Sequence, residues 1–132
     1  MEILNKDLRK RILEKAYEDD FGHPGAALSC VDSIKYLYDY VLRKNYIFIL
    51  SKGHGGMALY AVLESKGFNP KWGEHPTLDE SQGIYATTGS LGHGIPLGLG
   101  RALAKKLKGD DGRVYVLEGD GGIQEGSNWE AL

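Results

Sequence analysis

Residues 46–56 read YIFILSKGHGG, an apolar run of strand length that leads directly into a glycine-rich turn. The first five residues are continuously apolar and rich in β-formers, which is typical of a strand buried on both faces of a parallel sheet. Residues 114–122, VYVLEGDGG, repeat this pattern of strand and glycine turn. Ligands of parallel sheets bind at the carboxyl ends of the strands. We therefore expect His54 and Asp120, which follow the two strands, to lie at one sheet edge and to meet over one ligand.

Apolar residues at helical spacing surround these two strands. The helices that they predict span residues 5–20, 28–42, 57–66 and 97–108. Residues 69–85 contain two prolines and show no clear period, so we expect an irregular surface loop there. The order of elements predicts an α/β fold, with a parallel sheet and flanking helices carried by the crossover connections.

The composition is that of a soluble globular protein, with 42% hydrophobic residues, 26% charged residues and a net charge of -2. This charge provides no general attraction to nucleic acid or to an anionic membrane. The longest apolar run is far too short to span a bilayer, and the opening MEILNKDLRK lacks the apolar core of a signal peptide, so we expect a cytoplasmic location. The single cysteine, Cys30, excludes an internal disulfide and is predicted to be a small buried residue of a helix.

Glycines and histidines both gather in the predicted turns. The 19 glycines cluster at residues 53–56, 89–100 and 119–126, which favours backbone brought close to a phosphate or diphosphate over simple connections. Each histidine lies beside glycine or proline: His23, His54, His75 and His93. Imidazoles can donate to phosphate or hydroxyl oxygens and can transfer protons near neutral pH. Their spacing is not that of a zinc site.

Asp120 stands between glycines at the end of the second predicted strand. Magnesium binds oxygen ligands, usually one or two carboxylates together with phosphate oxygens. Asp120 could therefore hold magnesium beside a diphosphate. An Asp-Gly turn without a ligand is an equally common use of this short motif.

Four motifs in order resemble the successive signatures of transketolase N-terminal regions. They are FGHPGAALS at 21–29, LSKGHGGMALY at 50–60, TTGSLGHGI at 87–95 and LEGDGGIQEGSNWEA at 117–131. The resemblance is strongest to the N-terminal subunits of split transketolases. It implies a thiamine-diphosphate-binding fold and the transfer of a two-carbon ketol unit between sugars or sugar phosphates, with thiamine diphosphate and Mg²⁺ as cofactors.

The resemblance implies a role for three of the histidines. His23 would hold the reacting end of the sugar, as a substrate-binding and catalytic residue. His54 would reach the cofactor diphosphate and the reaction centre, which makes it a cofactor-binding and catalytic residue. His75 would contact sugar hydroxyls, although Glu74 precedes it where the family motif GHPE has glycine.

The TTGSLGHG segment resembles the family's TTGPLGQG and implies a cofactor-binding loop. Gly89, Ser90 and Leu91 would contact the cofactor, with Leu91 packing on it. Ser90 and His93 replace the commoner proline and glutamine, a change that bears on substrate preference.

The last motif supplies the implied metal site. Asp120 matches the family's magnesium ligand, and Gly121 would let the backbone approach the diphosphate. Glu125 matches a catalytic carboxylate used at the subunit interface near the active sites. A glutamate at the start of a helix is also favoured by the helix dipole alone.

The resemblance further implies parts that residues 1–132 do not contain, namely a second magnesium ligand and a pyrimidine-activating glutamate. We expect residues 1–132 to form the N-terminal part of a transketolase-like domain that ends before it is complete and is inactive alone. Its expected partner is a further copy of itself or a C-terminal transketolase subunit. The apolar faces of the helices around 28–42, 57–63 and 97–107 exceed what two strands cover, which supports association.

Two alternatives remain open at this point. The chain could be a non-catalytic remnant or interaction module that keeps the beginning of the fold. It could also belong to a related thiamine-diphosphate enzyme of the deoxyxylulose-phosphate synthase or pyruvate dehydrogenase type, although GHPG at 22–25 favours transketolase.

Overall fold

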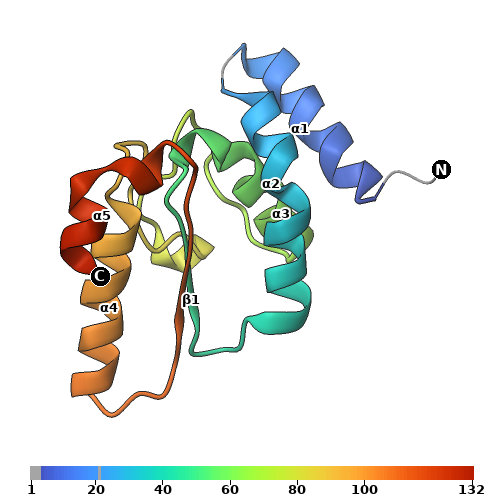
Figure 1. Cartoon of the computed structure of the whole chain (residues 1–132). Coiled ribbons are helices and arrows are strands. Elements are labelled where there is room, and N and C mark those ends of the chain that lie inside the picture. Colours follow the sequence, from blue (N-terminus) through green and yellow to red (C-terminus); the bar gives the residue numbers. More distant parts are fainter. Residues whose placement is uncertain (1–3, 21) are drawn as a thin grey trace.

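The computed structural model describes residues 4–20 and 22–132 (Figure 1). The α-helices are α1 (Lys6–Asp19), α2 (Pro24–Tyr36), α3 (Gly56–Ser65), α4 (Gly94–Leu107) and α5 (Gly126–Ala131). The strands are β1 (Ile47–Leu50) and β2 (Val114–Leu117). One π-helical turn, η1 (Leu37–Val41), and three 3₁₀ turns, η2 (Gly53–Gly55), η3 (Glu80–Gln82) and η4 (Gly122–Gln124), complete the elements.

The two strands form a parallel sheet in which Ile47 lies beside Val114 and Leu50 lies beside Leu117. Helices α3 and α4 lie between the strands in the chain, so the connection is a helical crossover. The predicted α/β fold with a parallel sheet is confirmed. Within residues 4–20 and 22–132, no helix combines the length and apolarity needed to cross a membrane.

Helices cover the sheet on both sides. Helices α1, α2 and α3 lie on one side, and α4 and α5 lie on the other (Figure 1). Phe48 and Leu50 point into the core built with α1–α3. Gly98 lets α4 approach the opposite face, because a Cβ there would lie 2.6 Å from Cγ2 of Val116. The strand β1 is therefore buried on both faces, as its composition predicts.

Helix α3 forms the centre of the core. Every residue from Gly56 to Leu63 is buried, because α1 and α2 both pack against this helix. The expectation of an uncovered apolar face at 57–63 is therefore wrong. Helix α4 does keep leucines exposed on its outer side: Leu97, Leu99, Leu103 and Leu107.

Three other expectations need correction. Residues 69–85 are irregular, but they are not only a surface loop, because Pro76 and Ile84 are buried. Strand β2 is only half-buried along its length, whereas Phe48 to Leu50 of β1 are fully buried. The helix expected from residue 28 begins earlier, at Pro24, because proline suits the first turn of a helix.

Candidate active site

The predicted meeting of the two strand ends is confirmed. His54 lies in η2, directly after β1, and Asp120 follows β2, so the parallel pairing brings both to the carboxyl edge of the sheet. The backbone N–H of Ser51 donates to the carbonyl oxygen of Leu117 at 2.9 Å, which extends the pairing into the turns. His54 and Asp120 are near enough for the carboxylate charge to raise the pKa of the imidazole.

The net effect of the surroundings is to lower the pKa of His54. Partial burial is the largest cause, followed by the positive charges of Lys52, His23 and His75, and Asp120 opposes them. A lowered pKa favours the neutral imidazole, which has one N–H donor and one acceptor nitrogen. His54 can therefore donate to an anion or exchange a proton near neutral pH.

Three of the histidines gather at this edge. The rings of His23 and His54 meet edge to face with centroids 6.0 Å apart. The ring of His75 lies against Gly89, where a Cβ would come within 2.8 Å of it. Gly53 in turn touches Gly89, because its Cβ would lie 2.5 Å from the Gly89 nitrogen. The turn after β1 therefore packs against the segment around Gly89, which packs against the segment around His75. Together these three segments form one wall of the site.

Glu74 and Lys52 also belong to this group, although the motifs assigned them no role. Oε1 of Glu74 lies 3.8 Å from Nε2 of His23. Nζ of Lys52 donates to Oγ of Ser29 at 3.1 Å, and so connects the turn after β1 to helix α2. Lys52 lies within the motif at 50–60 and Glu74 directly precedes His75, and these positions are the one signal in the sequence that could have identified them.

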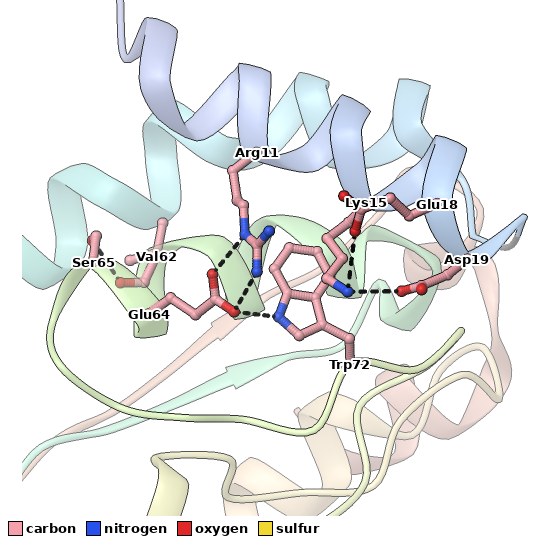
Figure 2. A network of polar contacts seen from close by, with 8 residues as sticks. All are labelled: Arg11, Lys15, Glu18, Asp19, Val62, Glu64, Ser65 and Trp72. Atoms are coloured by element: carbon pink, nitrogen blue, oxygen red, sulfur yellow. Dashed lines mark hydrogen bonds and ion pairs between the residues drawn. The ribbon is translucent and has the colours of Figure 1, made fainter.

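A polar network holds the segment that carries His75 (Figure 2). The carboxylate of Glu64, on α3, accepts from the Arg11 guanidinium at 2.9 and 3.1 Å and from Nε1 of Trp72 at 2.7 Å. The guanidinium also lies 5.4 Å from the centroid of the Trp72 ring. The hydrogen bond from Arg11 is the main reason that the pKa of Glu64 is lowered. Helices α1 and α3 therefore hold in place the segment that carries His75.

A second network joins the two strand ends. Ser51, after β1, donates from Oγ to Oε2 of Glu118, after β2, at 2.5 Å. The backbone N–H of Gly94 donates to Ser51 Oγ at 3.2 Å. The backbone N–H of Gly119 donates to Glu118 Oε1 at 2.9 Å. These contacts tie the turns of His54 and Asp120 to the start of α4. Sequence reasoning missed Glu118, and nothing local distinguishes it from a solvent-exposed glutamate.

Comparison with known proteins identifies the family. Residues 5–132 match the family described as transketolase, thiamine diphosphate binding domain. The chain belongs to this family. The match includes all four motifs and the whole wall of histidines and glycines.

Several curated relatives are subunits of split transketolases. One subunit of the apulose-4-phosphate transketolase of Phocaeicola vulgatus is 40% identical over 99% of this chain and 54% of its own length. The 6-deoxy-6-sulfo-D-fructose transketolase subunit SqwG of Clostridium sp. is 34% identical over 94% of this chain and 53% of its own length. The chloroplastic transketolase-1 of Arabidopsis thaliana is 37% identical over 83% of this chain and 19% of its own length. The chain thus spans about half the length of the first two relatives.

The candidate site fits a diphosphate ligand in three respects. A Cβ on Gly121 would meet nothing within 4 Å, so open space lies beside the backbone after Asp120. The hydroxyl oxygen of Thr88, next to Gly89, is buried without a hydrogen-bond partner among the described residues. Lys52 and His54 supply positive or donating groups at the same edge. This donor set and the glycine backbone suit an anionic cofactor.

The remaining motif residues lie beside this wall. A Cβ on Gly92, which has φ +77°, would overlap Cβ of Glu125, and Ser127 donates to the Gly92 carbonyl at 2.8 Å. Glu125 therefore packs against the TTGSLGHG loop. Ser90, Leu91 and His93 are exposed on that loop. Across the described part of the chain, no hydrogen bond or ion pair joins these four side chains to His23, His54 or His75.

Proposed function

We propose that this chain supplies the cofactor-binding part of a transketolase that transfers a two-carbon ketol unit between sugars or sugar phosphates. The observation that carries the proposal is the meeting of His54 and Asp120 at one sheet edge, beside His23 and His75. Relatives named for phosphorylated and sulfonated sugars support a sugar substrate for this chain as well.

The proposed cofactors are thiamine diphosphate and Mg²⁺. Asp120, which is exposed, would provide one carboxylate ligand to the metal. Among residues 4–20 and 22–132, no three His, Cys, Asp or Glu side chains are grouped to hold a metal ion. The other ligands would be diphosphate oxygens and the second protein ligand that the family motif implies. Neutral His54 would donate to the diphosphate, and the open backbone at Gly121 would allow its approach. When bound, thiamine diphosphate would supply the nucleophilic carbon that the transfer of a two-carbon unit requires.

The substrate side is assigned to the other histidines. His23 and His75 would hold sugar hydroxyls and move protons at those oxygens, because both imidazoles border the same wall as His54. Gly89, Ser90 and Leu91 would border the cofactor ring. Glu125, which packs against the same loop, would supply the catalytic carboxylate at the subunit interface. These roles follow from the family motifs and stand as proposals.

We also propose that a second subunit completes the site. Gly89, Asp120 and Gly121 are exposed, and an open half-site buries little of a ligand. The relatives named as transketolase subunits support a partner of the C-terminal transketolase type. We therefore expect the chain alone to bind magnesium and thiamine diphosphate weakly and to show no transfer activity.

The test uses the full chain and amide NMR spectra, which tolerate weak binding. Millimolar thiamine diphosphate with magnesium should shift the amides of residues 52–56, 88–91 and 119–122 together. In Asp120→Asn the magnesium-dependent part of these shifts should disappear, while Asp111→Asn should behave as wild type. Shifts located elsewhere, or shifts that Asp120→Asn leaves unchanged, would contradict the proposal. Micromolar or tighter binding would show that no second subunit is needed for the cofactor.

A further inference from the structure

The end of the site nearest His23 carries a negative charge that the transketolase motif does not predict. Glu74 stands where the motif GHPE has glycine, directly before His75. Its carboxylate lies 3.8 Å from Nε2 of His23, and its side chain remains 61% exposed. The carboxylate therefore forms part of the wall of the site rather than part of the core.

The charges of the site are divided between two ends. Lys52 acts on His54 as a positive charge, and Asp120 lies on the turn after β2. That end suits a diphosphate with its metal. Glu74 lies on a different segment and adds its negative charge beside His23. An anionic group therefore meets attraction at one end and repulsion at the other.

The position of Glu74 is set by packing. Trp72, two residues earlier, is held by Glu64 of α3, and Arg11 of α1 binds the same carboxylate (Figure 2). On the other side, the ring of His75 rests on Gly89. The backbone that carries Glu74 is thus held on both sides, which keeps the carboxylate within reach of His23.

We propose that Glu74 is a specificity-determining residue, an inference that rests on the function proposed above. An ionised carboxylate only accepts hydrogen bonds, so Glu74 pairs with hydroxyl donors and repels phosphate or sulfonate. The part of the substrate that lies at the His23 end is therefore uncharged and rich in hydroxyl groups. Any anionic group of the substrate lies away from Glu74.

The test titrates inorganic phosphate into the full chain at constant pH and follows the imidazole resonances of His23 and His54 by NMR. The variants are Glu74→Gln and, as a matched control, Glu80→Gln. Glu80 is similarly exposed, at 57%, but it pairs with Arg101 instead of a histidine. Glu74→Gln should lower the phosphate dissociation constant read at His23 roughly two- to fivefold at low ionic strength, the scale of an exposed charge pair. The control should match wild type, and the difference should vanish near 1 M salt, where the Debye length is about 3 Å.

Three results would overturn the proposal. One is an equal dissociation constant at His23 in wild type and Glu74→Gln. Another is the lack of a saturable shift at His23 in Glu74→Gln, and the third is a phosphate effect confined to His54 in that variant. Because the titration contains no thiamine diphosphate, a failure of cofactor binding does not change how these results are interpreted.

Discussion

At the scale of single residues, the wall of the site depends on glycines that face a neighbouring loop. Gly89 has φ +130°, and a Cβ there would lie 2.8 Å from the ring of His75. Both the backbone conformation and the space therefore exclude a larger residue. Gly25, in the GHPG motif, has no atom within 4 Å of its Cβ position and adopts helical backbone.

These two glycines provide the first prediction. Gly89→Ala should lower the free energy of unfolding by about 1–3 kcal/mol and displace the His75 ring, because strain and overlap combine. Gly25→Ala should be neutral or stabilise by up to about 1 kcal/mol. Urea unfolding measures the stability, and the His75 ring resonances report the displacement. Unchanged His75 resonances in Gly89→Ala would show that the loop accommodates the methyl group elsewhere.

Glu64 leads to a second prediction, on stability and pH. Its carboxylate is 27% exposed and accepts hydrogen bonds from a charged guanidinium and an indole. Glu64→Gln should lower the free energy of unfolding near pH 7 by about 1–2 kcal/mol. This value is in the lower part of the range for charged hydrogen bonds, because solvent partly screens the pair. Glu18→Gln, which removes a 57% exposed partner of Lys15, should change it by less than about 0.5 kcal/mol.

The pH dependence of this difference has a definite sign. The pKa of Glu64 in the folded chain is lowered from its ordinary value of 4.5, with Arg11 as the largest cause. The stabilisation is therefore fully present above pH 4.5 and is lost as the pH falls through the lower, folded-state pKa. Urea unfolding of wild type and Glu64→Gln from about pH 7 to about pH 3 should show the two stabilities converge on the acid side. A constant difference over this range would contradict the role of the ionised carboxylate.

At the scale of elements, the approach of α4 to the sheet depends on one residue. Gly98 faces β2, with Cγ2 of Val116 only 2.6 Å from its Cβ position, whereas Gly100 on the same helix has nothing within 4 Å. The two glycines therefore differ in packing and share the same helical propensity.

This contrast supplies a third prediction. Gly98→Ala should destabilise the chain by about 1–3 kcal/mol, because the added methyl group pushes α4 away from the sheet. Gly100→Ala should stabilise it by about 0.5–1 kcal/mol, since alanine is the better helix former. Thermal unfolding of both variants checks the pair. Equal effects of the two changes would show that the helix does not pack on β2 as described.

At the scale of the whole molecule, the uncovered leucines of α4 make association expected. Leu99, Leu103 and Leu107 recur at a spacing of four residues and are 41%, 51% and 88% exposed. Such spacing places them on one side of the helix. An exposed apolar stripe of this kind is typical of an interface.

The fourth prediction is that the chain is not monomeric at micromolar concentration, or binds a completing subunit through α4. Leu103→Lys should reduce the association measured by light scattering over a dilution series. Leu13→Lys on α1 is the control, because Leu13 is also 51% exposed. A monomer at all concentrations with a single cooperative thermal transition would refute self-association of the chain. Equal effects of Leu103→Lys and Leu13→Lys would refute the role of α4.

Much of the fold could be predicted from the sequence because its signals are local. The apolar runs at 47–50 and 114–117, the helical periods and the glycine turns after each strand each depend on residues close together in the chain. Parallel pairing then follows from the helical connection, and with it the shared edge of His54 and Asp120. The family motifs extended this local pattern to a thiamine-diphosphate-binding domain.

Only the tertiary structure determined which side chains meet across that edge. The contacts of Glu64 with Arg11, of Ser51 with Glu118 and of His23 with Glu74 join residues that lie 53, 67 and 51 positions apart. No local period marks such a pair, because its energy comes from two segments that packing brings together. The burial of α3 and the exposure of α4 also depend on packing between distant segments. Both helices are apolar in composition, and the placement of α1 and α2 decides that α3 is the one covered.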